Sequence, residues 1–393
     1  MRINHFLRMA KENGISWALS PMLTINAISG IPAFSFKQYG SSYTRWRVYY
    51  IGIYVTLSFL FCFSLYLTIR IVHEITYFSK NTNIAANVRV TWAIYSIFSV
   101  TISGYLHFFR RRQVEEVFQG LSRLVIGGSV ERIRTWVYIQ VVAFLSFVVN
   151  FVLLSGSEFD SLRPVTTMDI FTTPVIMFWG SIHMEQEWQF YNILSLLRLS
   201  TKELNFRVRS LVANLDLRFE HRTHTAKDAK VLRQLLRLRE LQLKSYYIFK
   251  RAMSIYGIAN MILSGETLIS LAFLLFSAID SRIFGHNETI PLRTICSIYW
   301  IVCEVSAMIS VVAASECLHK EVERTEKLVI DAMLKVEDYP LRRELRLFAL
   351  QLLHTPFRSS ACGFFPLDLT LFTSMMATVV TYLVILVQFK SSE

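Results

Sequence analysis

The stretch GFFPLDLTLFTSMMATVVTYLVILVQF, residues Gly363–Phe389, predicts a hydrophobic helix near the end of the chain. A helix crosses a bilayer with roughly 20 mostly apolar residues, and this stretch is long enough to do so. It also carries hydroxyl groups along its length and a glutamine at its end, which a simple membrane anchor does not need. The polar residues of this helix therefore indicate a function, and their spacing is the first evidence of it.

One face of this helix is polar. Ser374, Thr378, Thr381, Ile385 and Gln388 follow one another in steps of 4, 3, 4 and 3 residues, which places them on a single face. Several copies of such a helix around an axis can line a pore, with Ile385 as a hydrophobic constriction that gates by dewetting. Alternatively, the stripe forms hydrogen bonds with neighbouring helices of the same subunit. The spacing alone leaves both interpretations open.

The composition is that of a membrane protein. Of the 393 residues, 53% are hydrophobic and 18% are charged, and the mean hydropathy is +0.39. A soluble protein has roughly 45–50% apolar and about 25% charged residues. The five cysteines lack paired metal-ligand spacing and are interpreted as buried thiols, so we expect no metal and no other cofactor. Because no nucleophile constellation or phosphate-binding loop is evident, the sequence does not indicate an enzyme.

The predicted fold is all-α, with seven transmembrane helices. Six apolar segments of sufficient length precede the last one. They are Val48–Ile69, Val90–Phe109, Thr135–Leu154, Asp169–Ile193, Met253–Ile279 and Thr294–Ser315. An odd number of spans places the two ends of the chain on opposite sides of the membrane.

The basic residues indicate which side of the membrane is cytoplasmic. Thirty-four of the 41 Lys and Arg residues lie in the N-terminal segment and in three loops on the same side. Because basic loops stay in the cytoplasm, we predict a cytoplasmic N-terminus and an extracellular C-terminus, opposite to a G-protein-coupled receptor. The sequon that begins at Asn287 then falls in an external loop, where glycosylation is expected. The net charge of +12 thus reflects topology, and no nucleic-acid partner is expected.

Residues 194–251 contain no Pro and no Gly and keep a helical period. Val231, Leu235, Leu238 and Leu241 recur at three- and four-residue spacing, with basic residues between them. We therefore predict that the fourth and fifth spans extend into the cytoplasm as amphipathic helices. We expect their apolar stripes to pack together beneath the membrane. The alternative is that their basic faces bind anionic lipid headgroups.

Two further helices are predicted in residues 316–360, with Pro340 in the first turn of the second, where its missing N–H costs nothing. We expect these helices to complete a cytoplasmic anchor domain. The predicted organisation is a cytoplasmic N-terminal segment (1–47), spans one to six (48–315, with cytoplasmic extensions in 194–251), anchor helices (316–360) and the last transmembrane helix (363–389).

Two acids lie near the centres of predicted spans. Glu266 and Glu304 are near the middle of the fifth and sixth spans, where an ionisable residue is costly and faces a cavity or another helix. They either line a ligand pocket or gating interface, or hydrogen-bond between helices. Aromatic and polar residues in the predicted outer halves of spans two to six either form an interfacial belt or line a cavity for a small organic ligand. The ligand-pocket candidates are Trp92, Tyr95, Asn150, Thr172, Met177, Glu266, Phe273, Tyr299, Trp300 and Glu304.

The end of the chain closely resembles the C-terminal signature of the insect gustatory receptor family, which is related to the insect olfactory receptors. That signature is Thr-Tyr, five apolar residues and Gln-Phe, with a glycine and a phenylalanine about 20 residues upstream. The residues that match it are Thr381, Tyr382, Gln388, Phe389, Gly363 and Phe364. The motif is short, but the seven-span topology agrees with it over the whole chain.

The resemblance implies a ligand-gated, non-selective cation channel of four identical or related subunits, in the plasma membrane of a sensory neuron. The last span of each subunit would line the pore for permeant cations, and the cytoplasmic helices would hold the subunits together. A small-molecule tastant would bind in the outer halves of spans two to six, with membrane lipids around them. By position in the motif, Ile385 and Phe389 match the gate and Gln388 the polar ring beside it, while Tyr382 and Gly363 match packing positions.

The residue after the Thr-Tyr pair bears on the ligand. Sugar receptors of the family tend to carry an acidic residue there, whereas this chain has Leu383. A bitter or otherwise aversive compound is therefore the expected ligand, and a fructose-type sugar receptor is the alternative. A metabotropic receptor is a second alternative. A transporter that uses Glu266 and Glu304 as coupling acids is a third, although no internal repeat supports it.

Overall fold

The structure is a computed structural model, built mainly of very long helices. It describes residues 19, 21, 58, 61–62, 65–66, 69, 94–95, 98–99, 101–103, 105–106, 109–124, 133–146, 149, 167–219, 226–283 and 292–391. Of the predicted first three spans, the structure describes only scattered residues of the first two, and residues 135–146 and 149 of the third.

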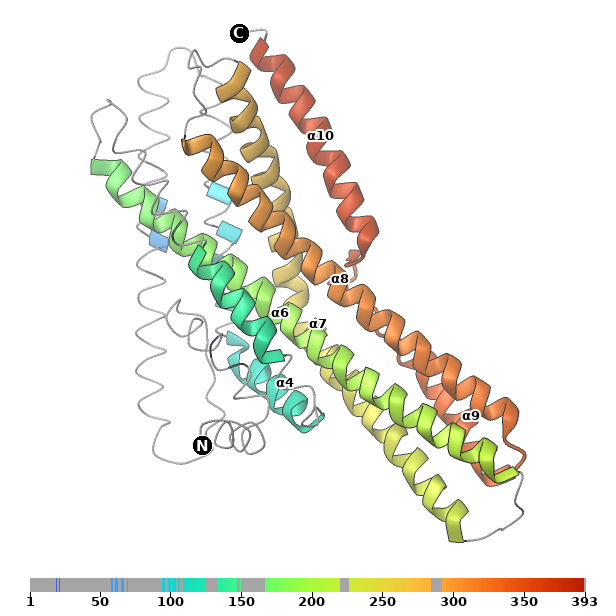
Figure 1. Cartoon of the computed structure of the whole chain (residues 1–393). Coiled ribbons are helices and arrows are strands. Elements are labelled where there is room, and N and C mark those ends of the chain that lie inside the picture. The colour runs from blue at the N-terminus through green and yellow to red at the C-terminus, as the bar shows by residue number, and fades with distance from the viewer. Residues whose placement is uncertain are drawn as a thin grey trace, which may run out of the picture.

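Three long helices form the frame of the molecule (Figure 1). They are α6 (Thr167–Phe219), α7 (Ala226–Ile283) and α8 (Leu292–Lys335), with 53, 58 and 44 residues. At about 1.5 Å per residue each is far longer than the ~30 Å thickness of a hydrocarbon core. Each helix is therefore long enough to cross a membrane and still continue well beyond it. The unbroken helical period predicted for residues 194–251 corresponds to the second part of α6 and the first part of α7.

Two shorter helices complete this frame. α4 (Arg111–Leu124) packs against α7, and its apolar residues face the interior. α9 (Tyr339–His354) follows a three-residue break after α8, with Pro340 in its first turn as the sequence predicts. Because the break reverses the chain direction, α9 packs back against α8 and α7 at the end of the molecule far from α10 (Figure 1).

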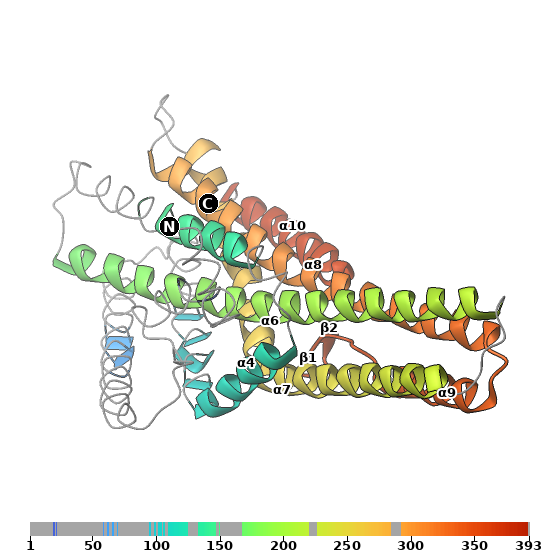
Figure 2. The ribbon, with the colours of Figure 1, turned by 60° about the horizontal axis from the view of Figure 1, so that its bottom comes forward.

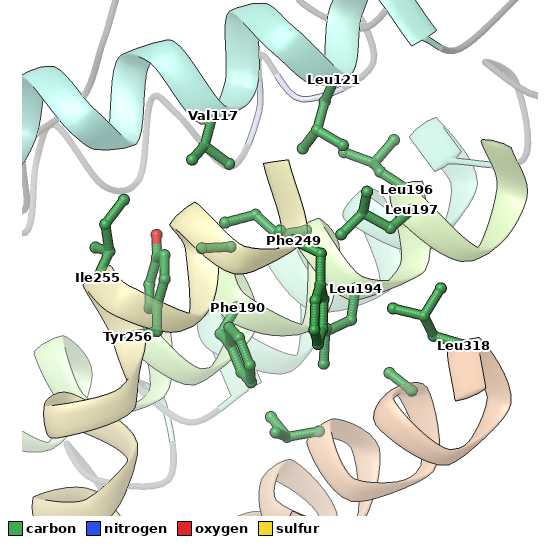
Figure 3. Close-up of a cluster of buried hydrophobic side chains, with 14 of the residues drawn as sticks. Val117, Leu121, Phe190, Leu194, Leu196, Leu197, Phe249, Ile255, Tyr256 and Leu318 are labelled. Atoms are coloured by element: carbon green, nitrogen blue, oxygen red, sulfur yellow. The ribbon is translucent and has the colours of Figure 1, made fainter. Parts of the chain in front are cut away.

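The interior contains two apolar clusters. The central core lies where α4, α6, α7 and α8 meet, and Figure 3 shows its side chains converging from these helices. The α9 core lies at the other end, between α6, α7, α8 and α9. It consists of Leu204, Val208, Leu211, Val231, Leu235, Leu238, Val329, Ala332, Val336, Leu341, Leu345, Phe348 and Leu352. Three of the four residues in the predicted stripe of α7 are thus buried there, at roughly 1.5–3 kcal/mol for each large side chain.

A short hairpin and a final helix follow α9. The strands β1 (Ser360–Ala361) and β2 (Phe365–Pro366) pair antiparallel, with Ser360 opposite Pro366. They lie beside α7, between the α9 core and α10 (Leu369–Ser391), as Figure 2 shows. The last span was predicted to begin at Gly363, and this is wrong. Residues 363–368 form the turn, β2 and the link to α10, because Gly363 adopts a positive φ of 80° and Pro366 cannot continue a helix there.

By length and composition, three described helices are able to cross a membrane. They are Ala229–Phe276, Ile298–Lys335 and Leu369–Phe389. In the most apolar 18-residue stretch of each helix, 50%, 44% and 11% of the stretch respectively is buried inside the molecule. The third helix is thus the most apolar of the three and the least covered by the rest of the chain.

Candidate functional site

The candidate site begins with the two faces of α10. One face packs on α7 and α8 through Met375 and Val379, which are buried. The other faces are largely open, and Figure 1 shows α10 standing at the edge of the helical frame. Large apolar residues on these open faces are Val380, Tyr382, Val384, Ile385 and Phe389. An apolar surface of this kind requires lipid or another protein chain to cover it.

The polar stripe of α10 lies on this open side. Ser374 and Thr381 are exposed and Thr378 is half-buried, while Ile385 and Gln388 are exposed further along. Each of the three hydroxyls donates a hydrogen bond to the carbonyl oxygen four residues earlier, at 2.8, 2.9 and 3.0 Å. Their protons are therefore used within α10 and not in bonds to neighbouring helices, while the hydroxyl oxygens of the exposed pair face outwards.

Two of the predicted packing residues contact little in the single chain. Gly363 has open space where a side chain would stand, so its role here is to supply the positive φ of the hairpin turn. Tyr382 is 55% exposed, so any bracing by its ring involves a molecule outside this chain.

The start of α10 is held by Asp368. Its carboxylate oxygen Oδ1 accepts hydrogen bonds from the backbone N–H groups of Thr370 and Leu371, at 2.9 and 3.2 Å, and from the Thr370 hydroxyl. This is an N-cap, which satisfies donors that have no partner within the helix. The hydroxyl bond is the main cause that lowers the pKa of Asp368 below its ordinary value.

The hairpin before this cap is seated on α7. Ala361 and Leu367 are buried, and Phe357 stacks on Phe249 of α7 with ring centroids 4.9 Å apart. Gly257 of α7 allows the backbone at Cys362 to approach closely. The chain thus passes from α9 to α10 through a link that is fixed against the frame.

The acids of the predicted pocket are buried between helices. Glu304 of α8 accepts hydrogen bonds from the indole of Trp300, at 3.2 Å, and from the Thr267 hydroxyl of α7, at 3.5 Å. Glu266 accepts from the Ser270 hydroxyl one turn further along α7, at 2.8 Å. Glu304 thus joins α8 to α7, whereas the bond of Glu266 to Ser270 stays within α7.

The other pocket candidates fall into separate places. The Tyr95 hydroxyl lies against Gly265, next to Glu266, and Phe273 is buried further along α7. Tyr299 instead contacts Ser146, with 2.5 Å between their hydroxyl oxygens. Thr172 and Met177 lie in α6, where only the backbone is described, while Trp92, Asn150 and Asn287 lie outside the described residues.

A second polar set was not recognised as a unit in the sequence. Glu185, Gln186, Glu187, Gln189 and Asn192 of α6 are all buried. Gln189 accepts from the Tyr256 hydroxyl at 3.0 Å, Gln186 accepts from Ser103, and Asn192 exchanges hydrogen bonds with Gln140. The signal was present as a polar run inside a predicted span, but the partners come from helices remote in sequence.

Polar networks also join the helices around the α9 core. The Asn205 amide of α6 donates to Glu321 of α8, and the Thr325 hydroxyl donates to Asn205 Oδ1 at 2.6 Å. Gln351 of α9 donates to the side chain of Gln242 of α7 at 2.6 Å. Satisfied buried networks of this kind fix one arrangement of helices.

A family model described as 7tm Chemosensory receptor matches residues 19–393. The chain therefore belongs to this family of seven-span receptors, which confirms the resemblance drawn from its last residues and the expectation that it is not an enzyme.

Two curated relatives of Drosophila melanogaster are similar over part of their length. Gustatory receptor 23a is 32% identical over 155 residues, which are 38% of this chain and 39% of that relative. Gustatory receptor 68a is 24% identical over 164 residues, which are 41% of this chain and 42% of that relative. In each case the similarity spans less than half of the relative.

Two solved structures of insect olfactory receptor OR5 from Machilis hrabei share the fold. The complex with eugenol has a TM-score of 0.72 over 95% of this chain and 98% of that one. The other structure has a TM-score of 0.68 over 97% and 100%. At 14% sequence identity the likeness concerns the fold, and it confirms the predicted all-α membrane architecture.

Proposed function

We propose that four copies of this chain, or this chain with related subunits, form a ligand-gated, non-selective cation channel. A small-molecule tastant opens it, and α10 of each subunit lines the central pore. The channel acts in the plasma membrane of a chemosensory neuron.

The burial of α10 is the observation that carries this proposal. α10 is the most apolar described helix, yet only 11% of its apolar window is covered by its own chain. Two of its three stripe hydroxyls belong to exposed residues, Ser374 and Thr381, and each of the three donors is satisfied inside the helix. Lipid can cover the apolar faces of α10 but offers no polar contacts to the stripe. In a closed ring of subunits, the apolar faces are covered and the stripe faces water in the pore.

The proposed pore surface runs along this stripe. Ser374, Thr378 and Thr381 offer hydroxyl oxygens to hydrated cations. Ile385 and Phe389 form the hydrophobic gate, and Gln388 forms the polar ring beside it. Because the gate residues are exposed in the single chain, neighbouring subunits are required to close it.

The α9 core belongs to the proposed anchor domain on the cytoplasmic side. Its helices continue directly from the spanning parts of α6, α7 and α8, and its outer surface carries exposed Leu334, Tyr339 and Leu353. These residues are suited to contacts between subunits. The polar networks around this core join α6 to α8 and α9 to α7.

The proposed ligand is a bitter or otherwise aversive compound, bound among the pocket candidates around Tyr95, Glu266, Trp300 and Glu304. The presence of Leu383, where an acidic residue is typical of sugar receptors, supports this assignment over a fructose-type receptor. A pocket with indole, phenol and carboxyl groups suits an aromatic or amine-bearing molecule better than a polyhydroxyl one.

Whole-cell current in cells that express this chain alone tests the proposal, with a panel of sugars and bitter alkaloids as ligands and with G proteins blocked. We expect a fast, cation-selective current with an alkaloid. Silence in spite of surface expression, also after co-expression of related receptors, would overturn the channel. A current that G-protein blockade abolishes would identify a metabotropic receptor instead.

A further inference from the structure

The helix of residues Ile133–Ser146 lies beside α6 (Figure 1). Two contacts with α6 fix its inward side. Gln140 exchanges hydrogen bonds with Asn192, at 2.9 and 3.4 Å, and the ring of Phe144 meets that of Trp188 edge-on, with centroids 6.4 Å apart. These contacts determine which side chains of the helix point away from the molecule.

One strip of the outward side is polar at its start and apolar along the rest. Its members follow one another in steps of 4, 4, 3 and 4 residues, which places them on one side of the helix. They are Arg134, Tyr138, Val142, Leu145 and Val149, and we call them the Arg134 strip. The last four are between 46% and 65% exposed. The strip is therefore an amphipathic surface that the chain itself leaves uncovered.

The Arg134 strip begins at one edge of the predicted spans. The two contacts with α6 occur in reverse order along the two helices, so the helices run antiparallel. Arg134 comes six residues before Gln140. Arg198 comes six residues after Asn192, so the two arginines lie at one level. The predicted fourth span ends just before Arg198, and in the predicted orientation this level is the headgroup region of the cytoplasmic leaflet.

The apolar part of the strip is about as long as one leaflet is thick. From Tyr138 to Val149 the helix rises about 16 Å, at ~1.5 Å per residue. One leaflet contributes half of the ~30 Å hydrocarbon core. An acyl chain of a single phospholipid can therefore follow the strip over its full length.

The polar end of the strip offers hydrogen-bond donors and a positive charge. Arg134 Nη2 donates to the Tyr138 hydroxyl at 2.9 Å, and the guanidinium carbon lies 5.3 Å from the centroid of the Tyr138 ring. Tyr138 thus holds the guanidinium at the first turn of the strip. Because the Tyr138 oxygen accepts this bond, its own proton points elsewhere and can be donated to another group. A guanidinium has five N–H donors, so one bond to Tyr138 does not exhaust it.

This combination selects a phosphate group. A phosphodiester carries a negative charge and only accepts hydrogen bonds, and the planar fork of arginine matches its oxygens. A sterol hydroxyl brings no charge to the guanidinium. In a zwitterionic headgroup, the ammonium group beside the phosphate is repelled by Arg134, so a lipid with net negative charge fits best.

We propose that the Arg134 strip binds one anionic phospholipid of the cytoplasmic leaflet. Its phosphate lies between the Arg134 guanidinium and the Tyr138 hydroxyl, and one acyl chain follows Val142, Leu145 and Val149. The site does not depend on the proposed channel, because no residue of α10 takes part in it.

Photolabelling of the purified full-length chain in phosphatidylcholine nanodiscs tests the site. The probe is a trace of phosphatidylserine whose acyl chain carries a diazirine. We expect adducts on the peptide that contains residues 142–149, and their loss as unlabelled phosphatidylserine replaces phosphatidylcholine. Adducts on residues 298–309 of α8, which also include exposed apolar side chains, should not change. Adducts on 142–149 that persist, or that fall as far when cholesterol is added instead, would overturn the site.

Arg134→Gln removes the charge and should lower the competed labelling roughly tenfold, as expected for a lost hydrogen bond to a charged group. Arg198→Gln removes the same charge at the same level of α6, where the side chain is exposed, and should leave the labelling unchanged. Tyr138→Phe keeps the charge and the ring and should lower the labelling about threefold, for one neutral hydrogen bond. It also tests the site if Arg134→Gln does not fold. Labelling that neither site variant lowers, or that Arg198→Gln lowers equally, would overturn the proposal.

Discussion

Gly257 of α7 and Cys362 of the hairpin turn lie in direct contact. A β-carbon on Gly257 would stand 3.2 Å from the sulfur of Cys362 and 3.3 Å from its backbone nitrogen. Cys362 itself has a φ of 51°, so the turn that touches Gly257 is tightly specified. The link between the α9 core and α10 is therefore seated on α7.

We expect Gly257→Val to displace the hairpin and to destabilise the protein by about 1–3 kcal/mol, because the added atoms meet the sulfur of Cys362 and also its backbone nitrogen and α-carbon. The measurement is the thermal unfolding midpoint of the purified chain in detergent. Ser254→Val, at an exposed position one turn earlier on α7, is the matched control. Equal shifts in the two variants would show that the contact with Cys362 does not matter.

Asp368 gives a second prediction. Asp368→Ala removes the acceptor for two backbone N–H groups at the start of α10 and should cost about 0.5–2 kcal/mol. Asp368→Asn keeps a capping oxygen and should cost less. Thermal unfolding of the three proteins at neutral pH checks this order, and an Asn variant as unstable as the Ala variant would contradict the cap.

The same residue predicts a dependence on pH. The pKa of Asp368 is lowered in the folded chain, chiefly by the Thr370 hydroxyl. A group of this kind stabilises the fold above its unfolded pKa, near 3.9, and loses that contribution as the pH falls through the folded value. The wild type should therefore lose more stability than Asp368→Asn between pH 5 and pH 3. Parallel stability curves over this range would contradict the assignment.

The network between α6 and α8 predicts the effect of Thr325→Val. This nearly isosteric change removes the hydroxyl that donates to Asn205 Oδ1 at 2.6 Å, and it leaves a buried acceptor unsatisfied. We expect a loss of about 1–3 kcal/mol in the free energy of unfolding. Thr370→Val is not a suitable control, because the Thr370 hydroxyl donates a hydrogen bond to Asp368, the N-cap of α10. Thr373→Val, whose exposed hydroxyl bonds only within its own helix turn, should have a small effect.

The sequence predicted the polar face of α10 because helical spacing alone determines which residues share a face. It predicted the long helices of the α9 core for the same reason, since Val231, Leu235 and Leu238 repeat at that spacing. It did not predict the hairpin, because residues 363–367 are mostly apolar and were assigned to the span that follows. The positive φ of Gly363 and the pairing of Ser360 with Pro366 depend on the fit against α7.

The buried polar set of α6 marks another limit. Glu187 and Gln189 were visible as polar residues inside an apolar segment, but hydropathy carries no information about their partners. Tyr256 is 67 positions from Gln189, and the two meet only because α6 and α7 pack antiparallel in one register.

Ile385 supplies a prediction about the closed state of the proposed channel. Ile385→Ala shortens a side chain that is 39% exposed on the stripe, and it should widen the constriction and raise the current without ligand. Val384→Ala removes a similar apolar group next to the stripe and is the control. Basal current is measured before any ligand is added. A closed state that is as tight as in the wild type would show that Ile385 is not the gate.

Gln388→Glu tests the polar ring beside the gate. Four carboxylates in place of four amides attract cations strongly in a narrow pore, so we expect the calcium-to-sodium permeability ratio to rise roughly twofold or more. Reversal potentials in mixed ionic solutions measure this ratio. Gln388→Asn shortens the side chain without adding charge and should leave the ratio close to that of the wild type. Because permeability depends only on residues that ions approach, an identical ratio in all three proteins would place Gln388 away from the pore wall and assign the stripe of α10 to packing.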